Sequence, residues 1–377
     1  MVLAEIVDRH RVLVCLGSGG VGKTTTSAAI ALRAALQGKR TLCLTIDPAR
    51  RLANSLGLSE LRGEEQLIDP ASLEPLGLRM RGSLFAMMLD MKHTFDELVE
   101  RYAASPAQRR RILDNRIYQY VSTSLAGTQE YMAMEKLHAM RDDPRFDFIV
   151  LDTPPTTNAL DFLEAPQRLV GAIDSPVMRW FVQSLRQSTG LNLLGRSVSM
   201  VLRGLSKFTG AEFLEHVGEF ITDVNQLFGG FRDRAQSVYD DLRGPDVAFV
   251  IVTSPSPQAV GEAAFFSGKL REYGISPDAV VVNRVQAAVE VRGEPDPAEL
   301  AALLPPDVDA RGLLDRMRDA AYEQSAMAAR DREGIRLLRQ QVGANTVYAE
   351  VPALDRDVHD LAALAQIGHH LMGPLAA

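Results

Sequence analysis

Residues 17–24 read Gly-Ser-Gly-Gly-Val-Gly-Lys-Thr, and this octapeptide constrains the fold more than any other feature of the chain. It matches the pattern G-x-x-x-x-G-K-[ST] and lies between an apolar run at 11–16 and a helical pattern over 24–37. Glycines let successive backbone N–H groups turn toward one phosphate, and the helix start adds the positive end of its dipole. A strand, a glycine loop and a helix in this order predict an α/β protein that binds a nucleotide.

The loop sequence assigns a chemical role to its residues. The Lys23 side chain is expected to reach the β- and γ-phosphates, and the Thr24 hydroxyl to bind Mg²⁺. The alternative is a glycine-rich turn that contains Lys-Thr by chance, which we expect in roughly one chain of this length per hundred. Lys23 is also one of only six lysines in the chain. The residues predicted to contact the phosphates are Gly17, Ser18, Gly19, Gly20, Val21, Gly22, Lys23, Thr24 and Thr25.

Other apolar runs predict the rest of a sheet, because they are continuous rather than alternating, as in strands buried on both faces. These runs are 11–16, 41–46, 146–151, 247–252, 279–282 and 346–350. Helical patterns lie between them at 24–37, 259–273, 310–341 and 358–372. Strand–helix alternation predicts a doubly wound, mostly parallel sheet. Because the strands come from both ends of the chain, we expect one discontinuous domain.

The long middle of the chain contains no convincing strand ladder and reads mostly as helices. We therefore expect a helical insertion subdomain made of residues 84–141 and 161–240. The nucleotide-binding core is then made of residues 1–83, 142–160 and 241–377.

Two of the predicted strands are followed by an aspartate. Asp152 ends the run 146–151, and the carboxyl ends of parallel strands are where open α/β sheets bind ligands. We therefore predict that Asp152 holds Mg²⁺, directly or through water. Asp47 ends the run 41–46 and is placed to orient or deprotonate a water that attacks the γ-phosphate. The alternatives are an ordinary strand-ending Asp for Asp152 and an Asp-Pro turn for Asp47.

Composition excludes several classes of protein. Hydrophobic residues make up 46% of the chain and charged residues 24%, as in ordinary globular proteins. The net charge of −7 argues against a dedicated nucleic-acid binder, which usually has a basic face. Two cysteines, Cys15 and Cys43, are too few for a disulfide framework or a four-cysteine zinc site. No run approaches the ~20 apolar residues of a membrane span, so we expect a cytoplasmic protein.

Together these motifs resemble the ArsA-like ATPases, a family that includes arsenite-pump ATPases and ATPases that deliver tail-anchored membrane proteins. The resemblance covers most of the chain in order, and its motifs are the glycine loop, Ile46-Asp47-Pro48-Ala49, Asp152-Thr153-Pro154-Pro155 and Val281-Val282-Asn283. It implies the fold of a deviant-Walker P-loop NTPase, with ATP and Mg²⁺ as cofactors.

The resemblance also implies roles for individual residues. Asp47 matches the catalytic acid of switch I, and Asp152 matches the acid of switch II. Asn283 matches an asparagine that reads the adenine, although by itself it would be interpreted as a strand-end cap. The Val351-Pro352 turn matches a loop that flanks the same base.

The chain departs from that family at contacts made across a dimer. The family's signature lysine, which reaches the partner's ATP, would fall at position 18, which is Ser18. The family's Thr-x-Pro-Glu reads Thr253-Ser254-Pro255-Ser256, and no Cys-x-x-Cys pair is present for a dimer-bridging zinc. We therefore expect no zinc and weak ATPase activity from the chain alone. We expect a homodimer, or a heterodimer with a paralogue that supplies the lysine.

The function implied by the resemblance is ATP hydrolysis coupled to a switch that handles a hydrophobic client or a membrane-protein partner. One alternative is a nucleotide-dependent regulatory subunit with little hydrolysis. Another is an arsenite-pump ATPase subunit, which the missing cysteines disfavour. The candidate client surface is residues 169–231 with Met87, Met88 and Met91, and core packing is the alternative for all of it; within it, the irregular stretch 169–205 is the better candidate. Residues 213–231 have the stripe of an amphipathic helix, which is more typical of core.

Overall fold

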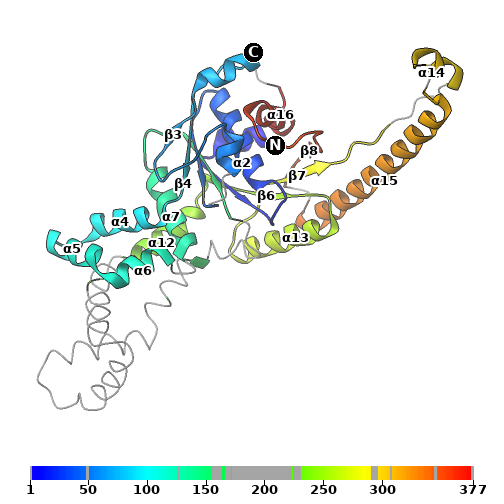
Figure 1. Ribbon diagram of the computed structural model, residues 1–377. Coiled ribbons are helices and arrows are strands. Elements are labelled where there is room, and N and C mark those ends of the chain that lie inside the picture. Colours follow the sequence, from blue (N-terminus) through cyan, green and yellow to red (C-terminus); the bar gives the residue numbers. More distant parts are fainter. Residues whose placement is uncertain are drawn as a thin grey trace, which may run out of the picture.

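The computed structural model shows a single mixed sheet covered by helices (Figure 1). It describes residues 2–47, 51–124, 128–154, 231–289, 296–305, 308–343 and 346–374, together with Glu164, Ala165, Gly171 and Asp223. Within these residues the sheet has eight strands in the order β3-β4-β2-β5-β1-β6-β7-β8. All neighbours are parallel except β3 and β4. The predicted mostly parallel α/β fold is therefore confirmed.

All six predicted strands are present, with ends that differ from the prediction by at most three residues. They are β1 (Val12–Leu16), β2 (Arg40–Thr45), β5 (Phe148–Asp152), β6 (Val247–Thr253), β7 (Ala279–Val285) and β8 (Val347–Pro352). β1 lies between β5 and β6 in the middle of the sheet. Its side chains alternate between two hydrophobic clusters, with Val12 and Val14 in one and Leu13 and Cys15 in the other. A strand covered on both faces must be apolar at every position.

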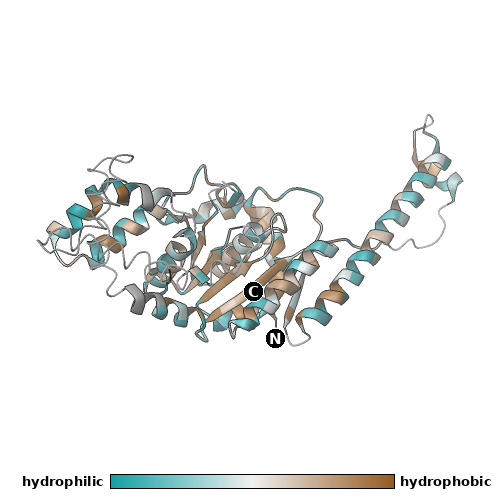
Figure 2. Ribbon diagram, turned by 90° about the horizontal axis from the view of Figure 1, so that it is seen from below, coloured by the Kyte–Doolittle hydropathy of each residue, from teal (hydrophilic) through white to brown (hydrophobic). Residues whose placement is uncertain are grey.

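Helices from distant parts of the chain cover the two faces of the sheet. One face is covered by α1 (Leu3–Arg9), α2 (Lys23–Leu36) and α16 (Leu361–Met372). The other is covered by α7 (Thr128–Arg141), α12 (Phe231–Leu242), α13 (Pro257–Glu272) and one end of α15 (Ala310–Val342). The strands form the brown, hydrophobic interior in Figure 2. This two-sided arrangement is the doubly wound architecture that the sequence predicts.

Two strands at one side of the sheet were not predicted. β4 (Ser83–Met88) pairs in parallel with β2, and β3 (Gln66–Leu67) pairs antiparallel with β4. The predicted boundary at residue 84 is therefore wrong, because residues 84–88 belong to the sheet. Three of the six positions of β4 are only partly buried and α4 (Met91–Tyr102) begins soon after it, so the helical pattern that follows obscured the strand.

The methionines near β4 are not a client surface either. Met87 is 1% exposed in the core, and Met88 and Met91 are half-buried against the two hydrophobic clusters. Of the other candidate surfaces, residues 169–205 and 213–231 lie outside the described residues, apart from Gly171, Asp223 and Phe231. Their roles stay predictions.

Three short helices extend from the sheet next to α7 (Figure 1). They are α4, α5 (Pro106–Asp114) and α6 (Arg116–Ser124), and they pack around Val99, Ile112 and Tyr118. The remaining described helices are α3 (Arg51–Ser55), the 3₁₀-helix η1 (Pro70–Leu76) and α14 (Pro297–Leu303).

α15 forms a long arm that leaves the sheet and ends near α14 (Figure 1). Its C-terminal end packs closely on the sheet, since a Cβ on Gly334 would lie 2.3 Å from the Pro255 carbonyl oxygen. Ile335, Leu338 and Val342 are buried there. The arm is 33 residues long. Among the helices of the described ranges, none combines the length and the apolar character that crossing a membrane requires.

The burial of Met87 makes a prediction about stability. Replacing Met87 by Ala removes a fully buried side chain, so we expect the free energy of unfolding to fall by about 2–5 kcal/mol. The matched control is Met327→Ala, because Met327 is 41% exposed and should change stability by no more than about 0.5 kcal/mol. Urea denaturation followed by circular dichroism measures both. Equal effects of the two substitutions would contradict the placement of β4 in the core.

Candidate functional site

The glycine loop lies at the carboxyl edge of the sheet, between β1 and α2. Gly17, Gly20 and Gly22 have φ angles of 156°, 79° and 94°, which favour glycine. A Cβ on Gly17 would lie 2.2 Å from the Val252 carbonyl oxygen, and one on Gly22 would lie 2.2 Å from the Asn283 amide nitrogen. The loop is therefore packed tightly against the ends of β6 and β7, which only glycine permits at these two positions.

Lys23 is the first residue of α2 and is 6% exposed. Its Nζ atom donates to the Ser18 carbonyl oxygen at 2.8 Å, so the side chain folds back over the loop. Burial lowers the pKa of Lys23, and the nearby carboxylates of Asp152 and Asp47 oppose that decrease. This cation therefore lies over the loop and is paired electrostatically with the two predicted functional aspartates.

The Asp152 carboxylate is fully buried and joins three elements of the fold. Its Oδ2 atom accepts hydrogen bonds from the Thr24 hydroxyl at 2.8 Å and from the Thr45 hydroxyl at 2.9 Å. Its Oδ1 atom is buried and has no hydrogen-bond partner among the described residues. Burial raises the pKa of Asp152 to about 6, although the two hydroxyls and Lys23 act in the opposite direction.

This donor set fits the predicted Mg²⁺. Mg²⁺ binds through oxygen ligands and usually takes one or two carboxylates from the protein. Asp152 offers a buried carboxylate oxygen without a partner, beside the Thr24 hydroxyl that it already contacts.

Asp47 follows β2 and lies beside this cluster. Its backbone N–H donates to the Thr45 hydroxyl at 3.2 Å, and the N–H of Ile46 donates to the Asp152 carbonyl oxygen at 3.2 Å. Thr45 therefore bonds both to the Asp152 side chain and to the backbone of Asp47. Residues 48–50, which complete the Asp-Pro-Ala sequence, lie outside the described residues. The structure thus brings together Lys23, Thr24, Asp47 and Asp152, and their roles stay predictions.

Asn283 also lies against the loop. It is 9% exposed, and its amide nitrogen donates to the Val21 carbonyl oxygen at 2.9 Å, while its Oδ1 atom accepts from the Arg284 backbone at 3.0 Å. Arg284 has a φ of 61°, which is uncommon for a residue other than glycine. Asn283 therefore fixes the position of the loop. Whether its amide also reads a base stays a prediction.

The predicted turn at Val351-Pro352 is wrong. Both residues belong to β8, where Pro352 pairs with Val285, and Val351 is 1% exposed in the hydrophobic cluster under α16. β8 is an edge strand, and edge strands tolerate proline because one row of their N–H groups has no strand to pair with. The buried Val351 side chain is not available to flank a base.

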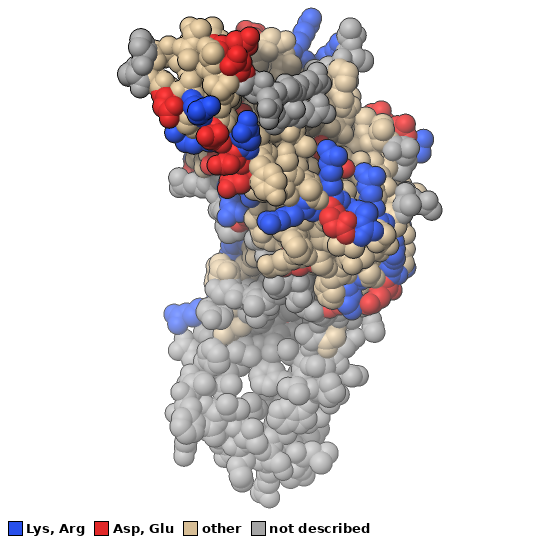
Figure 3. All heavy atoms as spheres, turned by 90° about the vertical axis from the view of Figure 1, so that its right-hand side faces the viewer, with Lys and Arg blue, Asp and Glu red and all other residues tan. Residues whose placement is uncertain are grey.

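A pocket of about 460 Å³ opens beside the loop, and sequence reasoning did not identify most of its lining. It is bounded by residues 18–21 of the loop, the start of α13, the segment after β7 and the sheet end of α15. Its charged residues are Glu262, Arg284, Arg330 and Asp331. Figure 3, which views the molecule from the right-hand side of Figure 1, shows acidic and basic residues interspersed over the described surface. The one sequence signal that could have identified Arg284 is its position directly after Asn283.

The two cysteines are core residues. Cys15 and Cys43 are 0% exposed in β1 and β2. Burial raises the pKa of Cys15 to about 12 and that of Cys43 well above its ordinary value. Both thiols are therefore protonated near neutral pH, whereas the thiolate is the form that binds soft metals. Within the described part of the chain, no group of three or more His, Cys, Asp or Glu side chains could hold a metal ion.

Comparisons with known proteins agree with this site. A family model described as "Anion-transporting ATPase" matches residues 10–293. "Putative arsenical pump-driving ATPase 1" of Aquifex aeolicus is 25% identical over 289 residues, which cover 73% of this chain and 63% of that protein. "ATPase GET3" of Rhodotorula glutinis is 28% identical over 272 residues, which cover 71% of this chain and 68% of that protein. The chain thus spans less than two thirds of the Aquifex relative.

The raised pKa of Asp152 makes a prediction about pH. An acid whose pKa rises from 3.8 to about 6 on folding destabilises the folded state when it is ionised, and this cost is present above pH 6 and lost below pH 3.8. Asp152→Asn should therefore stabilise the nucleotide-free, Mg²⁺-free protein. We expect this gain to increase by about 2 kcal/mol between pH 4.5 and pH 8.

The measurement is the free energy of unfolding of both proteins at the two pH values. Asp147→Asn is the matched control, since the bonds from Arg40 lower the pKa of that exposed carboxyl to about 2 and its loss should give no gain. A stability difference for Asp152→Asn that is independent of pH would contradict the assignment of a buried, ionisable carboxyl.

Proposed function

Because the chain belongs to the ArsA-like family of anion-transporting ATPases, we propose that it hydrolyses ATP with Mg²⁺ and couples hydrolysis to a conformational switch. The observation that carries the proposal is the hydrogen-bonded cluster in which Asp152 contacts both Thr24 and Thr45, with Asp47 attached to Thr45. It supports one site in which the loop, the predicted metal ligands and a candidate general base meet at the carboxyl edge of the sheet.

The proposed reaction is attack of water on the γ-phosphate. Backbone N–H groups of the loop and the Lys23 ammonium hold the phosphates and offset the charge that develops on them. Asp47 orients the attacking water and accepts its proton. Thr24 and Asp152 would hold Mg²⁺, which when bound would supply further neutralisation of the phosphate charge.

The same cluster supports a switch. The Oδ2 atom of Asp152 accepts from both hydroxyls, so a change in the charge on this carboxylate would alter both hydrogen bonds. Thr45 would pass that change to Asp47 through a single hydrogen bond. We propose that the output is the handling of a hydrophobic client or membrane-protein partner by the helices outside the sheet. Support for this output comes from the apolar sequences at 169–205 and 213–231.

We also propose that the working unit is a dimer, either of two copies or with a paralogue that supplies a lysine. In this chain Ser18 hydrogen-bonds Glu262 and thereby lowers the pKa of that carboxyl. Ser256 caps α13 by accepting from the Ala259 N–H at 3.4 Å. Both serines therefore make contacts within their own chain, at the two positions where the family resemblance implies charged contacts to a partner's nucleotide.

Two other functions are alternatives to this one. A regulatory subunit with little hydrolysis is supported by Ser18, because an ATPase without the signature lysine lacks that cation across the dimer. An arsenical pump-driving role is supported by the name of the Aquifex relative. Against that role stands the burial of Cys15 and Cys43, which leaves no accessible thiol pair for arsenite. The cytoplasmic location stays a prediction from sequence.

Two substitutions separate binding from hydrolysis. Asp47→Asn should reduce the turnover number by about 10²–10⁴-fold with nucleotide affinity unchanged, since it removes a proton acceptor and keeps the shape. Lys23→Ala should weaken nucleotide binding itself. Phosphate release and binding of a fluorescent ATP analogue measure the two effects. The controls are Asp315→Asn and Lys269→Ala, which change an exposed residue on α15 and a half-buried one on α13, each in an ion pair away from the loop. Unchanged turnover in Asp47→Asn would overturn the proposed reaction.

The dimer proposal is tested at position 18. If a cation across the dimer is what the chain lacks, Ser18→Lys should raise turnover of the purified protein, in the direction of the 10³–10⁵-fold that arginine fingers supply elsewhere. Turnover is measured over a range of protein concentrations, with the molar mass determined by light scattering. Fast turnover by the wild-type protein that Ser18→Lys leaves unchanged would contradict the proposed dependence on a partner's lysine.

A further inference from the structure

The peptide unit between Ile46 and Asp47 is held at both of its polar atoms. Its carbonyl oxygen, on Ile46, accepts from the Gln129 side-chain amide at 3.0 Å. Its N–H, on Asp47, donates to the Thr45 hydroxyl at 3.2 Å. The rotation of this peptide unit sets where the backbone places Asp47. Its two bonds therefore fix the direction from which the Asp47 carboxylate approaches the site.

The two bonds come from different parts of the fold. Thr45 belongs to β2 and is tied to the sheet through Asp152, whereas Gln129 lies in the first turn of α7. Gln129 is 83 positions away from Ile46 in the chain. The sheet thus fixes one side of the peptide unit, and a separate helix fixes the other.

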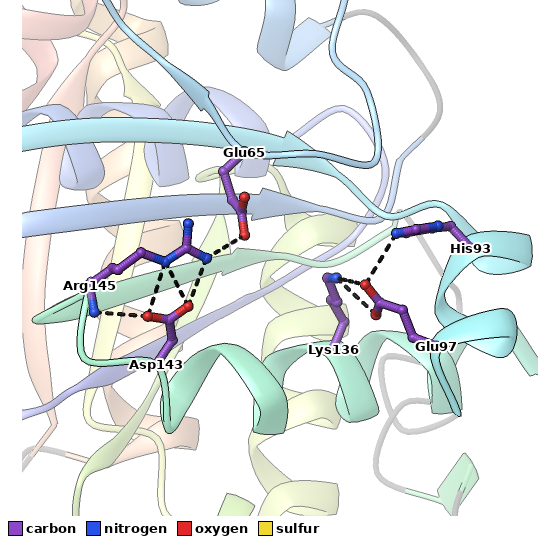
Figure 4. Close-up of polar contacts among 6 residues, drawn as sticks. All are labelled: Glu65, His93, Glu97, Lys136, Asp143 and Arg145. Carbon is purple, nitrogen blue, oxygen red and sulfur yellow. Dashed lines mark hydrogen bonds and ion pairs between the residues drawn. The ribbon is translucent and has the colours of Figure 1, made fainter. Parts of the chain in front are cut away.

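α7 is itself firmly held between the sheet and α4. Tyr131, Met132, Ala133, Met134 and Leu137 are buried under the sheet. On the α4 side, the Lys136 ammonium is 3.0 Å from both carboxylate oxygens of Glu97, and His93 lies 3.2 Å from the same carboxylate (Figure 4). The Lys136 side chain is 7% exposed. Glu97 is 34% exposed, so it is the buried Lys136 ammonium that would be left uncompensated if the two helices separated, and the pair resists that separation.

The other network in Figure 4 is of a different kind. Arg145 bonds to Asp143 and Glu65, but its side chain is 58% exposed, and exposed ion pairs contribute little to stability. Beyond α4, the helix α5 bonds to Asp223 through Arg111 at 2.6 Å and through Gln108 at 3.1 Å. α7 therefore lies between the segment that carries Asp47 and the helices that reach residue 223.

We propose that Gln129 is a positioning residue for Asp47, and that α7 connects the orientation of Asp47 to the helices α4–α6. The proposal rests on the proposed function, in which Asp47 orients the attacking water. Without the amide of Gln129, the peptide unit loses the bond that holds its carbonyl oxygen, and Asp47 samples orientations that are not productive. Small errors in the position of a catalytic group are costly, while binding of the phosphates by the loop does not involve this peptide.

The test compares Gln129→Met with Gln119→Met. Methionine keeps the length of glutamine and removes the donor. Gln119 in α6 is the matched control, because its side-chain amide also donates from a helix to a backbone carbonyl. The acceptor is the carbonyl oxygen of Leu113 in α5. We expect Gln129→Met to lower kcat about 5- to 50-fold with KM and nucleotide affinity unchanged, and Gln119→Met to leave kcat unchanged. An increase in KM with unchanged kcat would overturn the proposal.

A second readout does not depend on activity. Hydrogen–deuterium exchange of a peptide that covers residues 41–47 should be faster in Gln129→Met than in the wild type. Exchange in α16 should be the same in the two proteins. A wild-type protein without turnover would contradict the proposed function, and the exchange would still decide the role of Gln129. Wild-type exchange rates in Gln129→Met would overturn the role of Gln129, whatever the turnover.

Discussion

The buried carboxylate of Asp152 is the interaction on which the rest of the structure depends. An ionised carboxylate in a sheet interior is costly unless hydrogen bonds and nearby cations compensate it. Here the Thr24 and Thr45 hydroxyls and the Lys23 ammonium do so in part, and they come from two elements, α2 and β2. The requirement to surround this one charge draws the start of α2 and the end of β2 to the end of β5. The glycine loop and Asp47 take their places from those two elements.

The centre of the fold could be predicted from the sequence, and its edge could not. β1, β5, β6 and β7 are covered on both faces, so each contains a continuous apolar run that is visible without context, and polar residues occur only toward the carboxyl ends of β5, β6 and β7. β4 is only partly buried at three of its six positions, and a helix begins soon after it. At β8 the proline suggests a turn. A strand is possible there because β8 lies at the edge of the sheet, where one row of its N–H groups has no strand to pair with.

The candidate site shows the same division between local and tertiary information. Lys23, Thr24, Asp47 and Asp152 are recognisable because the motif spacing is fixed within one strand and the turn that follows it. Thr45 is an ordinary β-branched residue in a strand until the fold places Asp152 beside it. Gln129 belongs to a helix, and no local sequence pattern predicts its contact with Ile46. Asn283 has an identifiable partner only once β7 lies next to the loop.

The arm formed by α15 has a geometric consequence. The sheet end of the helix is fixed by the close approach of Gly334 to Pro255 and by the bond from the Gln286 backbone N–H to Asp331. The 21 residues from Ala310 to Arg330 extend beyond that bond, over a length of about 32 Å. If the helix pivots by about 5° about its sheet end, the far end therefore moves by about 3 Å. A change at the ends of β6 and β7 that is too small to see in the core is thus amplified at the tip.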